Sequence, residues 1–186
     1  MRIIAGRFRG LRLPALRGSA VRPTAERVRE AVFSMLGTEV VDARVLDLFA
    51  GLGSFGLEAL SRGAVSVVFV DKDRKVTERL ALTIKAFGAT DGASVFTMDA
   101  FEAVRVFFRE GSKFDIVFLD PPYGDRLISR VLSLREFPGL VEPEGIVVTE
   151  RETRGLQERV PASFRRVSSR KYGDTLIEVF RYEESR

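Results

Sequence analysis

The chain has 186 residues, of which 45% are hydrophobic and 30% are charged, a balance typical of a globular protein and not of a disordered one. It contains neither Cys nor His, which excludes disulfides and cysteine-ligated metals and removes the commonest general base. It also lacks an apolar run as long as a membrane span and the apolar core of a signal peptide. We therefore expect no metal centre, no membrane segment and a cytoplasmic location.

The charge is unevenly distributed along the chain. Residues 1–29 contain eight Arg and one acidic residue, a net charge of +7, whereas the remainder carries −3. A basic segment beside a mildly acidic body predicts that the segment binds a polyanion. Of the 30 basic residues 25 are Arg, whose planar fork binds phosphate and whose face stacks on bases.

The N-terminal region predicts two elements. Residues 2–13 alternate polar and apolar positions after Gly6, which is typical of a short hairpin or edge strand with its arginines on one face. A helix is expected after Thr24, a plausible N-cap, and before Gly37. Arg27 and Arg29 lie off its predicted apolar stripe. The residues of that stripe are Val28, Ala31, Val32, Met35 and Leu36.

From residue 44 the pattern alternates between strand and helix. Strands are expected near residues 44–49, 65–71, 94–98, 114–120 and 145–150, and helices near 54–62, 74–87, 100–110 and 125–136. This alternation predicts an α/β fold with a mostly parallel, doubly wound sheet. Residues 164–171 and 175–182 differ, since they predict a C-terminal antiparallel hairpin at the sheet edge.

A glycine-rich loop joins the first strand to its helix. Residues 51–56 match the pattern G-x-G-x-x-G, and they follow a strand and open a helix, which is the context that this weak motif requires. The glycines allow a tight turn and a close approach of the backbone to a ligand. Asp71 ends the second strand, where its carboxylate can accept both ribose hydroxyls of an adenosine.

Two cofactors suit this loop, a dinucleotide and S-adenosylmethionine. Asp47 favours the second, because a carboxylate attracts the α-ammonium of the methionine part and repels a pyrophosphate. Asp99 closes the third strand and can contact the adenine amino group, although a helix N-cap explains it equally well. The predicted cofactor-binding residues are Asp47, Phe49, Gly51, Gly53, Asp71, Lys72, Asp99 and Ala100.

The strongest motif is the Asp-Pro-Pro-Tyr sequence of residues 120–123, directly after a predicted buried strand. Ligands bind at the carboxyl edge of such sheets, and two prolines there form a stiff corner. Asp120 and the Pro121 carbonyl can accept the two hydrogens of an exocyclic amino group while Tyr123 stacks on its base. We therefore predict Asp120, Pro121, Pro122 and Tyr123 as the catalytic residues of an amino-group methyltransferase.

Several segments together resemble the RsmD family of S-adenosylmethionine-dependent 16S rRNA guanine-N2 methyltransferases. They are residues 2–6, 22–30, 46–51, 56–64, 120–123 and 171–175, so the resemblance runs nearly end to end. The Asp-Pro-Pro-aromatic corner is shared with many amino-group methyltransferases. The Arg22-Pro23-Thr24 helix start, joined to a basic N-terminal hairpin, is more specific to this family.

The resemblance implies a Rossmann-like class I methyltransferase, monomeric, that acts on one guanine of 16S rRNA or of a small-subunit assembly particle. It implies that Asp47, Gly51, Asp71 and Asp99 contact the cofactor and that residues 120–123 contact a flipped base. We expect an RNA-binding extension over residues 1–37 and a methyltransferase domain over 38–186. The predicted RNA-binding residues are Arg2, Arg7, Arg9, Arg12, Arg22, Thr24 and Arg27.

Three other functions stay open at this point. The same corner serves adenine-N6 methylation of RNA or DNA, although no separate sequence-reading domain is evident for a DNA enzyme. A glutamine-side-chain methyltransferase acting on protein is disfavoured by the clustered arginines. An RNA-binding assembly factor without catalysis is disfavoured by the intact Asp120.

Overall fold

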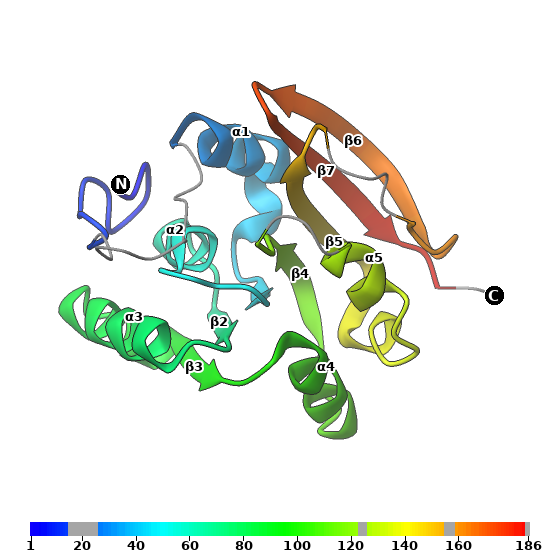
Figure 1. The fold of residues 1–186 in the computed structure, drawn as a ribbon. Coiled ribbons are helices and arrows are strands. Elements are labelled where there is room, and N and C mark those ends of the chain that lie inside the picture. Colours follow the sequence, from blue (N-terminus) through cyan, green and yellow to red (C-terminus); the bar gives the residue numbers. More distant parts are fainter. Residues whose placement is uncertain (15–25, 123–125, 155–158, 185–186) are drawn as a thin grey trace.

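The computed structural model describes residues 1–14, 26–122, 126–154 and 159–184, which form one seven-stranded sheet with helices on both faces (Figure 1). The spatial order of the strands is β3-β2-β1-β4-β5-β7-β6. The first five strands in this order are parallel, and β7 and β6 are antiparallel to their neighbours. The strands are β1 (Arg44–Asp47), β2 (Ser66–Asp71), β3 (Ala93–Thr97), β4 (Phe114–Leu119), β5 (Val141–Glu152), β6 (Phe164–Tyr172) and β7 (Thr175–Tyr182).

Two hydrophobic clusters pack the two faces of the sheet. One cluster lies under α1 (Glu26–Leu36), α2 (Ser54–Ser61) and α3 (Arg74–Ala86), and the other lies under α4 (Ala100–Arg109) and α5 (Leu127–Leu132). Because both faces are covered, β4 is a nearly continuous apolar run, five of whose six residues are buried. Short 3-10 turns complete the fold: η1 (Gly37–Val40), η2 (Thr90–Gly92) and η3 (Pro138–Leu140).

The strand order reverses between β1 and β4. From β1 the chain moves outward through β2 and β3, and it then returns to place β4 on the other side of β1. Such a reversal is where doubly wound sheets bind their ligands. The α/β class and the C-terminal antiparallel hairpin are therefore as predicted.

Two boundaries differ from the sequence-based expectations. Helix α5 covers only Leu127–Leu132, because Ser133 ends it and a chain of turns leads to Pro138, which opens η3. Strand β5 begins at Val141 and not near residue 145. Its first residues are irregular, with Glu144 at φ +61° and a register shift against β4, which breaks the alternation that a sequence pattern detects.

Residues 1–14 form a turn-rich hairpin, called here the N-terminal hairpin, and not a regular edge strand. A single bridge joins Arg2 to Arg12, and Ile3 N donates to Leu11 O at 3.0 Å. Gly6 and Gly10 have φ angles of +83° and +84°, a conformation that breaks an extended strand. The hairpin buries Ile3, Phe8 and Leu13 in the same cluster as α1 and α2.

Helix α1 ends at Leu36, before Gly37, as predicted, but Arg29 does not lie off the buried face. Its side chain is 0% exposed and packs between α1 and α2. The division at residue 37 stays a prediction, although the described parts on either side of it share a core. Among the helices of the described ranges, none is long and apolar enough to cross a membrane.

Candidate active site

Four aspartates lie where the parallel strands end. Asp47 is the last residue of β1 and Asp71 the last of β2, Asp99 follows β3 by two residues, and Asp120 directly follows β4. The parallel register brings these ends to one edge of the sheet: Asp47 pairs with Phe69 of β2 and Phe118 of β4, and Asp71 pairs with Thr97. The structure thus brings together the aspartates that the sequence singled out.

The loop from β1 to α2 follows this edge as a tight turn. Ala50 N donates to Val70 O at 2.8 Å, and Gly53 N donates to Ala50 O at 2.7 Å. Gly51 and Gly53 have φ angles of +53° and +75°, which a glycine adopts without strain. Gly53 is the N-cap of α2 and offers no side chain to its first amides.

Asp47 supplies the cap that Gly53 lacks. Its side chain is buried, and Oδ2 accepts the amide of Gly56, in the first turn of α2, at 3.0 Å. Burial raises the pKa of Asp47 to about 7, an effect opposed by the Gly56 amide and reinforced by the charge of Asp71. A nearby cation would restore the ionised form, so this position suits a positively charged ligand group.

Asp71 connects the ends of β1 and β2. Its Oδ2 accepts the Gly51 amide at 2.9 Å, and its Oδ1 accepts the Asp73 amide at 2.9 Å. These bonds fix the glycine loop and the start of the turn into α3. Each carboxylate oxygen has a second lone pair, so these bonds are compatible with a ribose hydroxyl as a further donor.

The remaining predicted cofactor residues surround this edge. Asp99 caps α4, with Oδ1 accepting the Phe101 amide at 2.8 Å, which is the structural role that the sequence allowed for it. Ala100 is buried behind it, Phe49 is half-buried and Lys72 is exposed. Contacts of these residues with a cofactor stay predictions.

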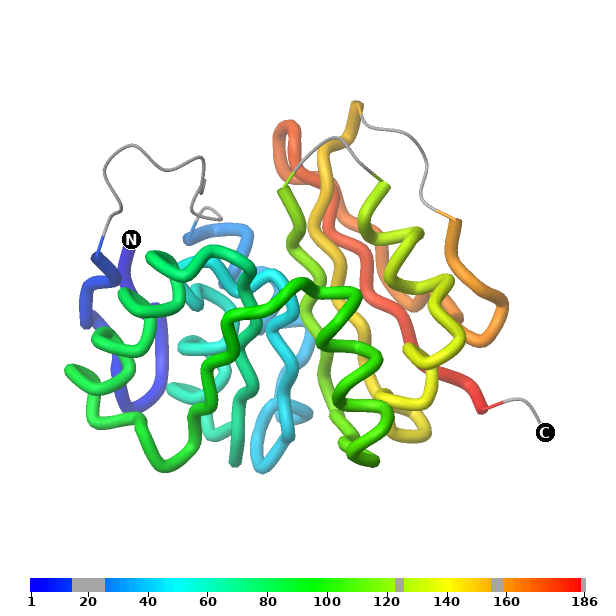
Figure 2. The backbone as a smooth tube through the Cα atoms, turned by 60° about the horizontal axis from the view of Figure 1, so that its bottom comes forward, coloured from blue at the N-terminus to red at the C-terminus, as the bar shows by residue number. Residues whose placement is uncertain are grey.

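The corner that the sequence predicts to be catalytic lies at the end of β4. Asp120 is half-buried, Pro121 is buried and Pro122 is exposed, while Tyr123 lies outside the described residues. Leu48 N donates to Phe118 O at 3.1 Å, which ties this corner to the β1 end beside the glycine loop. The ends of β4 and β5 and the β6–β7 turn lie together at the top of Figure 2.

The polar groups at this edge fit S-adenosylmethionine better than a dinucleotide. They are carboxylates and backbone amides, and Lys72 is the one basic side chain among the predicted cofactor residues. Carboxylates attract the ammonium and sulfonium charges and accept ribose hydroxyls, but they repel a pyrophosphate. Among the described residues, no group of three or more acidic side chains is placed to hold a metal ion.

The predicted RNA-binding residues fall on the N-terminal hairpin and α1. Arg7, Arg9 and Arg12 are exposed on the hairpin and Arg27 on α1, while Arg22 and Thr24 lie outside the described residues. Arg2 is exposed and paired with Glu26, with Nε and Oε2 3.3 Å apart. The structure therefore leaves most of the predicted basic surface accessible.

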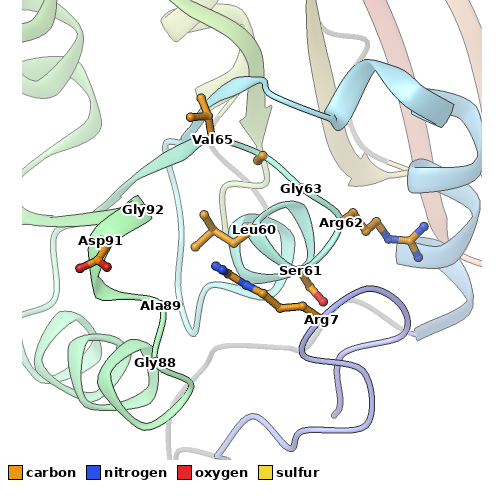
Figure 3. Close-up of a pocket in the computed structure, with 11 residues that line it drawn as sticks. Arg7, Leu60, Ser61, Arg62, Gly63, Val65, Gly88, Ala89, Asp91 and Gly92 are labelled. Carbon is orange, nitrogen blue, oxygen red and sulfur yellow. The ribbon is translucent and has the colours of Figure 1, made fainter.

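Sequence reasoning missed Glu58, which is 0% exposed and binds both the hairpin and α1. A signal was present, since Glu58 is the only charged residue in the apolar helix α2. Nearby, a pocket of about 540 Å³ opens between the hairpin, the end of α2 and the α3–β3 turn (Figure 3). It lies at the amino ends of β2 and β3, opposite the aspartate edge, and is not the catalytic site.

Comparisons with known proteins agree with this geometry. The model of the family described as Conserved hypothetical protein 95 matches residues 1–181. Ribosomal RNA small subunit methyltransferase D of Escherichia coli K12 is 35% identical over 164 residues, which cover 88% of this chain and 81% of that protein. The solved structure of yhhF from Escherichia coli gives a TM-score of 0.88 at 34% identity, covering 100% of this chain and 99% of that one.

A more distant structure shows the fold alone. An RNA methyltransferase from Salinibacter ruber, solved with S-adenosyl-L-homocysteine, gives a TM-score of 0.65 at 17% identity and covers 89% of this chain and 96% of that one. With its strand order and antiparallel end, the fold is that of the Rossmann-like class I methyltransferases. The match over residues 1–181, together with the relatives above 30% identity, places the chain by descent as well as by shape. It belongs to the Conserved hypothetical protein 95 family, the RsmD family of methyltransferases.

Proposed function

We propose that this protein transfers a methyl group from S-adenosylmethionine to the 2-amino nitrogen of a guanine in 16S rRNA. The main support for the proposal is the position of Asp120. It follows β4, which pairs with β1, and β1 leads into the Asp47–Gly51 loop at the point where the strand order reverses. Relatives named small subunit rRNA methyltransferase D support the rRNA substrate. The protein is an rRNA methyltransferase that uses S-adenosylmethionine, in line with a neighbour solved with the demethylated cofactor.

The cofactor residues hold the donor at the ends of β1 to β3. Asp47 would attract its α-ammonium, Asp71 its ribose hydroxyls, and Asp99 with Ala100 its adenine. When bound, the cofactor supplies an activated methyl group, so the protein mainly has to align donor and acceptor.

Asp120 acts on the acceptor. The amino nitrogen of guanine is a poor nucleophile, because its lone pair is delocalised into the ring. Hydrogen bonds from both amino hydrogens, to Asp120 and the Pro121 carbonyl, favour a pyramidal nitrogen and offset the positive charge that develops during attack. The target base must leave its stack to reach this corner, and Tyr123 would stack on it. Water is a sufficient acceptor for the proton that is lost.

The test is methyl transfer from labelled S-adenosylmethionine to small-subunit particles that lack the modification, followed by nucleoside analysis. N2-methylguanosine is expected. N6-methyladenosine would keep the chemistry and overturn the substrate, and no transfer despite cofactor binding would point to a binding protein without catalysis. A monomeric state and a cytoplasmic location stay predictions, and sedimentation of the purified protein tests the first.

A further inference from the structure

The carboxylate of Glu58 joins three elements at one buried point. Glu58 lies on α2 with its side chain 0% exposed. Its Oε2 accepts the Ile4 amide at 2.8 Å and its Oε1 accepts the Ala5 amide at 3.1 Å. Oε1 also accepts Arg62 Nε at 2.8 Å. One side chain thus binds the backbone of the N-terminal hairpin to α2.

Arg29 brings α1 to the same carboxylate. Its guanidinium is 0% exposed, with Nε 3.6 Å from Glu58 Oε2, and its Nη2 donates to the Arg2 carbonyl. Arg29 Nε and Nη1 have no hydrogen-bond partner within the described part of the chain. The buried cation therefore depends on the charge of Glu58, because an unpaired buried charge is strongly unfavourable.

Ser61, one helical turn after Glu58, forms a second attachment to the hairpin. Its Oγ accepts the Phe8 amide at 3.0 Å and donates to the Ala5 carbonyl, while its own carbonyl accepts the Arg7 amide at 2.8 Å. A Cβ on Gly6 would lie 1.7 Å from the Ser61 carbonyl oxygen, so the hairpin backbone lies directly against α2.

Figure 3 shows where the N-terminal hairpin contacts α2 at Ser61. Arg7 and Ser61 lie side by side where the hairpin meets α2, and Arg62 points away from the pocket toward α1. Phe8 also packs on Phe87 just after α3, with ring centroids 5.7 Å apart. The hairpin is therefore a fixed part of the molecule, whereas its Arg7, Arg9 and Arg12 side chains are exposed.

We propose that Glu58 and Ser61 are positioning residues for RNA binding, because they hold the arginines of the N-terminal hairpin in a fixed place relative to the methyl-transfer edge. This inference rests on the proposed function, since it takes rRNA as the ligand of the hairpin. Both side chains are buried, so the proposal gives neither of them a direct contact with the RNA. A pre-positioned set of arginines loses less conformational freedom on binding phosphates than a free arm does.

Two substitutions test the proposal, with one matched control. Glu58→Gln places an amide NH₂ opposite a backbone donor and leaves Arg29 without its counter-charge. Ser61→Ala removes two bonds to the hairpin and buries no charge, so it keeps the test valid if Glu58→Gln does not fold. Glu78→Gln is the control, because Glu78 also pairs with an Arg four residues away, Arg74, at 2.8 Å. Glu78 is exposed, and within the described residues it forms no hydrogen bond or ion pair with the hairpin.

The measurements are affinity for a small-subunit rRNA fragment at several salt concentrations, affinity for S-adenosylmethionine, and amide hydrogen exchange. For Glu58→Gln we expect RNA affinity to fall roughly tenfold. The slope of log affinity against log salt concentration should fall by about 2, because each of the three hairpin arginines would lose a phosphate contact that contributes roughly 0.7. For Ser61→Ala, RNA affinity should fall several-fold. The amides of Ile4, Ala5 and Phe8 should exchange faster in both, cofactor affinity should stay within about twofold, and Glu78→Gln should match the wild type.

Two results would overturn the inference. RNA affinity within about twofold of wild type in Ser61→Ala, despite faster exchange of the hairpin amides, would show that hairpin position does not matter. Parallel losses of cofactor and RNA affinity in both variants would show a general loss of the fold. Failure of the proposed function itself is distinguishable, since the wild-type protein would then neither bind nor methylate the RNA.

Discussion

Asp47 and Asp120 end adjacent strands, yet their surroundings differ. Asp47 is 2% exposed and bound to the first turn of α2, whereas Asp120 is half-buried at a corner stiffened by two prolines. Burial holds the pKa of Asp47 near neutrality, so its charge responds to what binds beside it. A partly exposed corner instead leaves Asp120 accessible to a base. These different surroundings support the proposal that Asp47 binds the cofactor and that Asp120 binds the target base.

Replacing Asp120 by Asn should abolish most of the methyl transfer. The amide has the same size but presents an NH₂ where the guanine amino group must donate, so the charge developing on nitrogen is no longer offset. We expect a fall in turnover on the order of 100-fold or more, by analogy with the loss of one transition-state hydrogen bond. Single-turnover rates check this, with cofactor affinity as the control. A rate within a few-fold of wild type contradicts the assigned role.

Cofactor binding should depend on pH through Asp47. The free protein holds this carboxyl with a pKa of about 7, and an α-ammonium beside it favours the ionised form and lowers that value. Below pH 7 binding must therefore release a proton, so affinity should rise with pH and level off above about 7. Calorimetry in two buffers of different ionisation enthalpy measures the release. Asp47→Asn should abolish this proton release. Proton uptake on cofactor binding would contradict the predicted direction of the pH dependence.

Stability should show the reverse pH dependence in the absence of ligand. The folded-state pKa of Asp47 lies above the unfolded value of 3.8, so protonation favours the folded form. The contribution is complete below the unfolded pKa and is lost as pH rises toward about 7. Denaturant unfolding between pH 4 and pH 8 measures it. If Asp47→Asn shows the same pH profile as the wild type, other groups are responsible.

The helices and strands followed from the sequence wherever one apolar pattern dominated. β2, β4 and α3 were placed to within a residue or two, because their buried runs and caps are local signals. Three features were not predicted correctly. Turns decide the end of α5, a register shift decides the start of β5, and two left-handed glycines decide the form of the N-terminal hairpin. Arg29 was placed wrongly and Glu58 was missed for a further reason. A buried ion pair between helices leaves no periodic pattern in a sequence, and its one trace here is the single charged residue of the apolar helix α2.

The third glycine of the loop motif is required for packing. A Cβ on Gly56 would lie 2.2 Å from Phe69 Cε1 and 2.8 Å from Val67 Cγ1, so α2 rests on β2 with no space for a methyl group. Gly56→Ala should therefore cost about 1–3 kcal/mol, the usual penalty for overpacking a core. Thermal unfolding checks this, with Ser34→Ala at an exposed position of α1 as the control. An unchanged melting temperature would show that α2 can shift.

At the scale of the whole molecule, the N-terminal hairpin and the corner at Asp120 lie in different parts of the fold. The hairpin is attached to α2 and to the end of α3, whereas Asp120 follows β4 on the opposite side of the β1 strand end. RNA bound by both must extend across the molecule, and the distance between its phosphate contacts and its flipped base is then fixed by the fold.

Charge reversal on the hairpin should weaken RNA binding without affecting the chemistry. The variant Arg9→Glu with Arg12→Glu changes two exposed side chains, and Arg105→Glu with Arg109→Glu makes the same change in charge on α4. We expect only the first to lower affinity strongly and to reduce the salt slope by about 1.4, roughly 0.7 for each lost contact. Titrations at several salt concentrations decide it. Equal effects of both pairs would mean that net charge alone matters.

The position of β4 has a consequence for how the protein is made. β1 pairs with β2, which follows it closely in the chain, but its other edge stays open until Phe114–Leu119 has been synthesised. An emerging chain can thus complete the glycine loop and the strands beside it while still lacking the acceptor corner. Until then, the unpaired edge of the central strand is open to pairing with other chains. An incomplete chain of this kind lacks the corner at Asp120, so under the proposed mechanism it cannot transfer a methyl group until β4 has joined the sheet.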